Sequence, residues 1–79
     1  MFYVYIIYSA LKDKYYIGQT SDLEKRLETH RLRKNLGASD WILKYSETYA
    51  TRSEAVKREL EIKNKKRRAY IEGLISAFG

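Results

Sequence analysis

Tyrosines are concentrated near the start of the chain. Eight of the 79 residues are tyrosines, and five of these eight precede residue 17. Two of them, Tyr5 and Tyr16, lie in the short segments Tyr3–Tyr5 and Tyr16–Gly18. A phenol can donate or accept a hydrogen bond and, when it is activated, can take a proton. A single buried tyrosine more often serves packing, so a catalytic role requires other reactive groups nearby.

Arg26 and His30 are spaced four residues apart in a segment that is typical of a helix. This spacing places both on one helix face, at the edge of the apolar stripe formed by Leu23 and Leu27. An arginine can bind two phosphate oxygens at once, and a histidine can transfer a proton near neutral pH. The same spacing is equally compatible with a solvated helix flank that carries a surface histidine.

Glu59 interrupts an apolar arc on a later helix. The arc consists of Ala55, Val56, Leu60 and Ile62. A carboxylate in a packing surface is costly unless it is paired or binds a cation. The first option is an ion pair with Lys63, which is the more common fate of a buried acid. The second option is coordination of Mg²⁺, which takes one or two carboxylates together with water and phosphate oxygens.

The chain is basic. It has 16 lysines and arginines against 10 acidic residues, for a net charge of +6, and its pI is near 9.6. This balance favours a polyanionic partner such as DNA. The basic run at residues 63–68 also fits an ordinary helix C-terminus, where cations complement the helix dipole. The cations predicted to bind nucleic acid are Lys14, Lys63, Lys65, Lys66, Arg67 and Arg68.

Runs of aromatic and β-branched residues predict three strands. The predicted strands are Phe2–Tyr8, Tyr15–Ile17 and Trp41–Tyr49. The first two are expected to form an antiparallel hairpin. If the loop is Ser9–Lys12, then Tyr5 lies directly opposite Tyr16 and two phenols converge on one face of the sheet. Alternation in the third strand predicts one face for its alternate residues Trp41, Leu43 and Tyr45.

Three helices are predicted from capping signals and apolar periodicity. The predicted helices run from Ser21 to about Lys34, from Thr51 to about Lys65, and from Ala69 to about Ala77. The first two begin with capping boxes, in which Ser21 and Thr51 each precede a glutamate by three residues. Residues 35–39 are expected to end the first helix and to connect it to the third strand.

Strands and helices in the order β-β-α-β-α-α predict an α+β fold, in one domain that spans residues 1–79. Cysteine is absent from the sequence, which excludes disulfides and thiolate zinc sites. No apolar run approaches membrane-spanning length, and the first strand lacks the features of a signal peptide. We therefore expect a cytoplasmic protein that does not contact membranes.

Five features resemble, in their order and spacing, the GIY-YIG nuclease superfamily and especially its small stand-alone bacterial members. They are Tyr3–Tyr5, Tyr16–Gly18, Arg26, His30 and Glu59. The resemblance extends from Phe2 to Ile71, and five points in order are more specific than any single motif. At two points the chain departs from the family pattern. Tyr3 stands where the first motif has glycine, and the family's C-terminal asparagine has no clear counterpart.

The resemblance implies a three-stranded antiparallel sheet flanked by helices, and metal-dependent hydrolysis of a DNA phosphodiester. It implies that Tyr5 and Tyr16 lie beside the attacking water and that one of them helps to deprotonate it. Arg26 would stabilise the charge on the phosphate, and His30 would support proton transfer or orient the substrate. Glu59 would hold one Mg²⁺ or Mn²⁺. This metal and Arg26 are expected to lower the pKa of a neighbouring phenol.

The leading functional hypothesis is a DNA endonuclease that acts in DNA repair or recombination. Low sequence specificity is expected, because phosphate contacts alone carry little sequence information. The alternative is a catalytically silent nucleic-acid-binding module with the same fold. A protein-interaction domain would leave Glu59 unexplained. The protein is expected to be a monomer or a weak dimer, and a partner protein could supply specificity.

Overall fold

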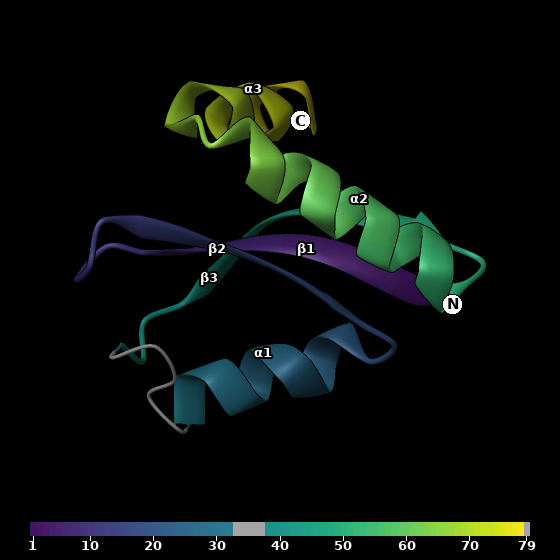
Figure 1. Ribbon diagram of the computed structural model, residues 1–79. Helices are drawn as coiled ribbons and strands as arrows, with labels where there is room; N and C mark the ends of the chain where they lie inside the picture. The colour runs from purple at the N-terminus through teal and green to yellow at the C-terminus, as the bar shows by residue number, and fades with distance from the viewer. Residues whose placement is uncertain (33–37, 79) are drawn as a thin grey trace.

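A three-stranded antiparallel sheet forms the middle layer of the structure, and helices cover both of its faces (Figure 1). The computed structural model describes residues 1–32 and 38–78. The elements are β1 (Phe2–Ser9), β2 (Lys14–Thr20), α1 (Leu23–Leu32), β3 (Ile42–Tyr49), α2 (Arg52–Lys65) and α3 (Arg68–Phe78). The predicted α+β fold and its element order are therefore confirmed. Within the described residues, no helix is long and apolar enough to cross a membrane.

Strand β1 lies at the centre of the sheet, between β2 and β3, and is antiparallel to both. Its segment Val4–Ile7 is completely buried, because helices lie over both faces of the sheet. Val4 and Ile6 pack with residues of α2 and α3. Tyr5 and Ile7 point to the opposite face and pack with residues of α1. The strand thus contributes to two separate cores, and Tyr5 belongs to the core under α1.

The β1–β2 hairpin has a different register from the one predicted. Tyr5 lies opposite Gly18, whereas Tyr16 lies opposite Ile7. The predicted register is wrong by two positions, because β1 continues through Ser9 and the loop begins one residue later than expected. Side chains alternate with a period of two along a strand, so a shift of two positions keeps Tyr5 and Tyr16 on the same face.

A bulge in β3 changes which of its residues share a face. Ile6 pairs with Tyr45, but the next residue, Ile7, pairs with Leu43, so Lys44 is an extra residue in the ladder. Such an insertion reverses the alternation of side chains. Tyr45 therefore packs in the core beneath α2 and α3, while Trp41 and Leu43 pack in the core beneath α1. The prediction that Trp41, Leu43 and Tyr45 share one face is wrong.

The cap of helix α1 lies one residue later in the sequence than predicted. The carboxylate of Asp22 accepts a hydrogen bond from the backbone N–H of Lys25 at 3.1 Å, so Asp22 caps the helix and the predicted Ser21 capping box is wrong. The described part of α1 ends at Leu32. The predicted helix end near Lys34 and residues 35–37 of the predicted connection lie outside the described residues.

Helix α2 begins at the predicted capping box, in which the Thr51 hydroxyl accepts from the Glu54 N–H and the Glu54 carboxylate accepts from the Thr51 N–H. The helix ends at Lys65 as predicted. The apolar arc is narrower than expected, because Ile62 is buried while Leu60 is 53% exposed. Lys66 then adopts a left-handed conformation with φ of 52°, which ends the helix and turns the chain into α3.

Candidate active site

The Tyr5 side chain lies very close to the backbone of Gly18, its partner residue on β2. A Cβ atom added to Gly18 would lie 2.5 Å from the Tyr5 hydroxyl and 2.7 Å from its Cζ atom. No side chain larger than hydrogen fits there unless the tyrosine ring moves. Glycine at position 18 therefore permits this close approach and lets the buried phenol lie over β2.

The Tyr5 hydroxyl lies between two side chains of α1. Nε of Arg26 donates to it at 3.3 Å, and Nε2 of His30 lies 3.1 Å from it. Because Arg26 and His30 are four residues apart on the helix, both point to the same place on the sheet. Arg26 and His30 therefore share one helix face, as their spacing predicted, and the helix brings a guanidinium and an imidazole to one phenol.

His30 is completely buried, so the interpretation as a surface histidine is wrong. Its ring lies edge-on to Tyr16, with ring centres 5.2 Å apart, and its centre is 6.3 Å from that of Trp41. Burial lowers the pKa of His30, and the positive charge of Arg26 lowers it further. The imidazole is therefore neutral at pH 7 and can accept a hydrogen bond through one ring nitrogen.

The pKa of Tyr5 is raised, mainly because the phenol is buried. The hydrogen bond and the charge of Arg26 oppose this shift but do not cancel it. The expectation that Arg26 lowers the pKa of a neighbouring phenol is thus correct in sign, and burial outweighs it at Tyr5. In the free protein, Tyr5 carries its proton at neutral pH.

Glu59 approaches the same tyrosines from α2. The Glu59 side chain is 17% exposed, and its carboxylate forms an ion pair with Nζ of Lys63 at 2.6 Å. The same ammonium lies 5.9 Å from the centre of the Tyr16 ring, and the negative charge of Glu59 contributes to the raised pKa of Tyr5. The ion pair considered in the sequence analysis is therefore present. It lies beside the phenols rather than on a remote part of the helix.

A divalent cation at this position would depend on Glu59. Within residues 1–32 and 38–78, no three or more His, Cys, Asp or Glu side chains are grouped so as to hold a metal. A single carboxylate suits Mg²⁺ or Mn²⁺, which accept water and substrate phosphate oxygens as the remaining ligands. The Lys63 ammonium already binds this carboxylate, so the position is one where the protein stabilises a positive charge.

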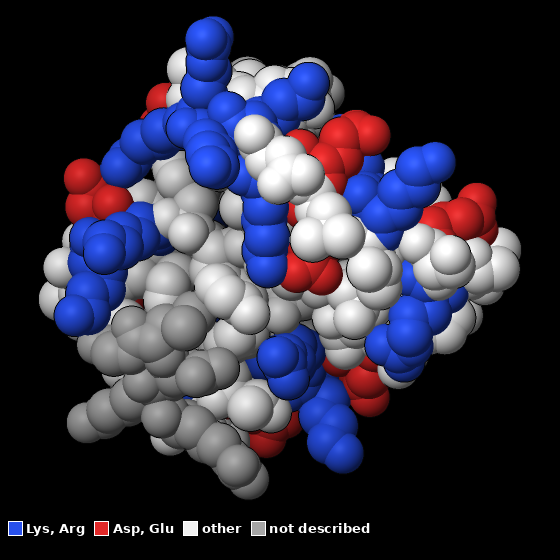
Figure 2. Space-filling view, viewed as in Figure 1, with Lys and Arg blue, Asp and Glu red and all other residues white. Residues whose placement is uncertain are grey.

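The predicted nucleic-acid-binding cations do not all lie together. Lys14, Lys63, Lys66, Arg67 and Arg68 line one groove beside β2. Lys65 instead lies over the ring of Tyr70, 5.5 Å from its centre. Figure 2 shows many lysines and arginines at the upper left of the molecule, over the region where α2 meets α3 and over the β1–β2 hairpin.

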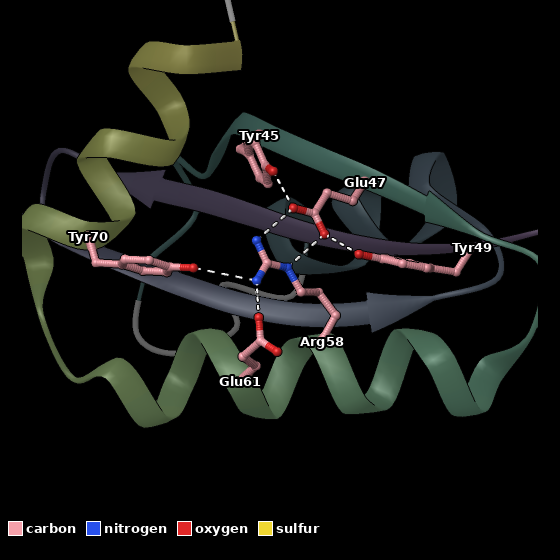
Figure 3. Close-up of polar contacts among 6 residues, drawn as sticks. All are labelled: Tyr45, Glu47, Tyr49, Arg58, Glu61 and Tyr70. Atoms are coloured by element: carbon pink, nitrogen blue, oxygen red, sulfur yellow. Dashed lines mark hydrogen bonds and ion pairs between the residues drawn. The ribbon is translucent and has the colours of Figure 1, made fainter.

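A second polar cluster, which the sequence analysis did not identify, lies between β3, α2 and α3 (Figure 3). Arg58 forms two bonds to Glu47, from Nε at 2.9 Å and from Nη2 at 3.1 Å. The hydroxyls of Tyr45 and Tyr49 also donate to Glu47. Sequence spacing gave no signal for this cluster, because the bulge in β3 decides which strand residues face α2.

Comparison with known proteins identifies one family. A family model described as the GIY-YIG catalytic domain matches residues 1–72, a range that contains all five candidate catalytic and metal-binding residues. A UPF0213 protein of Staphylococcus haemolyticus (strain JCSC1435) is 35% identical over 65 residues, which cover 77% of this chain and 78% of the relative. No solved structure matches the chain significantly.

Proposed function

Because the chain belongs to the GIY-YIG catalytic-domain family, we propose that it is a metal-dependent DNA endonuclease. The observation that best supports this proposal is the Tyr5 hydroxyl, which lies within 3.3 Å of Arg26 Nε and 3.1 Å of His30 Nε2. A phenol, a guanidinium and a neutral imidazole at one point can bind a phosphodiester and move a proton.

Arg26 binds the phosphate in this proposal. Its guanidinium donates to a neutral phenol, so its positive charge is available for an anion. Its planar fork can bind two phosphate oxygens. Negative charge on these oxygens grows as water attacks the phosphorus, and Arg26 stabilises the transition state more strongly than the bound substrate.

Tyr5 and His30 provide a route for the proton of the attacking water. Arg26 can only donate to the phenol oxygen, and in the tautomer of neutral His30 that carries its proton on Nδ1, Nε2 accepts the phenol's own hydrogen. Tyr5 accepts a proton from water as it passes its own proton to His30. The water oxygen bonds to phosphorus as the bond from phosphorus to the leaving oxygen breaks, and this oxygen takes a proton from solvent water. Tyr16, whose ring centre lies 6.4 Å from that of Tyr5, forms the other wall beside this water.

Glu59 is the residue that would hold Mg²⁺ or Mn²⁺. When bound, such an ion withdraws charge from the phosphate and lowers the pKa of coordinated water. A cation on Glu59 would replace Lys63 as the partner of this carboxylate, and the Lys63 ammonium would then be available to bind DNA. We further propose low sequence specificity, because the candidate residues contact phosphate groups rather than base edges. A role in DNA repair or recombination, a monomeric or weakly dimeric state and a partner protein that supplies specificity are parts of the same proposal.

Nicking of a supercoiled plasmid tests this function. Wild-type protein is expected to nick the plasmid with Mg²⁺ or Mn²⁺ and to lose activity in EDTA. Tyr5→Phe removes the hydroxyl but keeps the ring, and is expected to lower the nicking rate about 100-fold or more, as is typical for loss of a proton-transfer group. Tyr3→Phe removes a hydroxyl two residues away on the same strand and is the matched control.

The outcomes separate the competing functions. Nicking that is lost in Tyr5→Phe and kept in Tyr3→Phe supports the endonuclease. Nicking that persists undiminished in Tyr5→Phe would indicate a contaminating nuclease and overturn the proposal. Plasmid binding without nicking under every metal condition would instead establish the catalytically silent nucleic-acid-binding module.

A further inference from the structure

A groove with a cationic rim begins at the candidate active site and runs along the junction of α2 and α3. Lys63, which binds Glu59 at 2.6 Å, is also one of the residues that line this groove. Lys66 and Arg67 line it farther along, and Lys14 lines it from β2. The groove is therefore continuous with the site where a phosphate is proposed to be cleaved.

The cations of the groove differ in how far their charge is already neutralised. Arg68 is bound by Asp13 at 2.7 Å and by Glu72 at 3.2 Å. Among the residues that the structure describes, Lys14, Lys66 and Arg67 form no ion pair. Their charges are exposed to solvent, so these three cations attract an anionic partner more strongly than Arg68 does.

The spacing of the cations suits a polymer of phosphates. Lys66 follows Lys63 after about one helical turn, a rise of roughly 5 Å, and its left-handed conformation directs the chain toward Arg67 at the elbow between the helices. One strand of duplex DNA carries a phosphate for about every 3.4 Å of helix axis. The cations of the rim thus extend over a length comparable to the rise of one or two phosphates along the helix axis.

The floor of the groove is apolar. Ile17, Ile62 and Ile71 line it beneath the cations. A deoxyribose–phosphate backbone has charged oxygens on its outside and apolar sugar edges between them. A cationic rim above an aliphatic floor matches this chemistry better than it matches an acidic peptide, whose polar backbone groups would find no hydrogen-bonding partner on the floor.

We infer that this groove holds the backbone of the DNA strand that flanks the scissile phosphate on one side. Lys66 and Arg67 each bind one phosphate there, and Lys63 joins the groove to the catalytic residues. Lys65, although it is next to Lys66 in the sequence, lies over Tyr70 and contributes nothing specific to this contact. The inference rests on the proposed function, because it takes DNA as the substrate.

Salt-dependent DNA binding of two charge-matched double variants tests the inference. Lys66→Gln with Arg67→Gln removes two charges from the groove. Lys65→Gln with Lys57→Gln removes two exposed charges from α2 outside the groove. Binding of a fluorescein-labelled 20-base-pair duplex is measured by anisotropy in EDTA, at several salt concentrations, after thermal unfolding has shown that all variants are folded.

The groove variant is expected to reduce the slope of log affinity against log salt by about 1.8, the value for two lost phosphate contacts. Its affinity is expected to fall roughly tenfold or more. The control variant is expected to keep a slope close to that of the wild type. Equal slope losses in the two variants, or no loss in either, would overturn the inference.

The inference and the proposed function can fail independently. If the wild type nicks plasmid and the two double variants lose the same slope, the groove inference fails while the endonuclease stands. If the wild type binds duplex through Lys66 and Arg67 but never nicks it, the endonuclease fails and the groove is no longer next to a scissile phosphate, while its binding of a DNA backbone stands.

Discussion

Each face of the sheet holds an arginine among tyrosines. The two arginines differ in whether a carboxylate of the protein neutralises the guanidinium charge. Beneath α2 and α3, Arg58 binds the Glu47 carboxylate through two nitrogens. Beneath α1, Arg26 donates to the neutral phenol of Tyr5. The first arginine is thus matched by an anion within the protein. The second keeps its positive charge available for an anion from outside.

The pKa shifts follow the same difference. Burial alone would raise the pKa of Glu47, but Arg58 and the two tyrosine hydroxyls outweigh burial and lower it. Burial, together with the bond to this carboxylate, raises the pKa of Tyr49 to about 12. At neutral pH the Glu47–Arg58 cluster is therefore fixed in one protonation state. Similar residues therefore serve stability where their charges are paired, and are available for chemistry where their charges are not paired.

Arg26→Gln should produce the largest effect. Loss of a charge-stabilising donor typically lowers a catalytic rate about 100- to 1,000-fold. The free energy of unfolding should change by less than about 1 kcal/mol, because the side chain is largely exposed. Cleavage rates and urea unfolding of Arg26→Gln and the neighbouring control Lys25→Gln check this prediction. A large loss of stability with unchanged cleavage would reverse the roles assigned to the two faces.

Arg58→Met should have the opposite profile. It leaves the Glu47 carboxylate, whose side chain is 17% exposed, without its cation, and breaking such a pair costs about 2–4 kcal/mol. Cleavage per folded molecule should stay close to that of the wild type. Urea unfolding monitored by circular dichroism measures the first quantity, and cleavage normalised to the folded fraction measures the second. An unfolding free energy equal to that of the wild type would show that the pair does not stabilise the fold.

His30 should give the smallest effect, seen in the pH dependence of stability. Its pKa is lowered in the folded protein, whereas the unfolded chain titrates near its usual value of about 6.5. As pH falls below about 6.5, the unfolded state binds a proton that the folded state resists, so stability decreases by at most about 1.4 kcal/mol per pH unit. Comparing unfolding at pH 7.5 and 5.5 in wild type and His30→Gln isolates this contribution. The same pH dependence in both proteins would contradict a buried, neutral His30.

The order of the elements could be predicted because its signals are local. The Thr51 capping box sets the start of α2 within a few residues of sequence. The bulge at Lys44 could not be predicted, because an inserted residue leaves no mark on a run of aromatic and β-branched residues. The hairpin register also depends on a distant contact, since Ser9 and the turn after it are held by Asp40.

For the candidate site, too, local sequence signals predicted some features, whereas burial and long-range contacts could not be predicted. The spacing of Arg26 and His30 predicted that they point to one place, but spacing does not report depth, so the burial of His30 could not be decided. Glu59 was predicted either to pair with Lys63 or to bind a metal, and the structure contains the pair. The sequence showed the groove only as a basic run. It did not show that Lys65 lies over Tyr70 while its neighbour Lys66 lines the groove.

The role proposed for Glu59, on α2, is to complete a phosphodiester-cleaving site with the tyrosines and α1. It is tested most directly by the single-turnover cleavage rate of a defined DNA duplex in Mg²⁺, measured for wild type, Glu59→Gln and the surface control Glu28→Gln. We predict a loss of about 100-fold or more for Glu59→Gln and a rate close to wild type for Glu28→Gln. A Glu59→Gln variant that cleaves as fast as the wild type would contradict the claim.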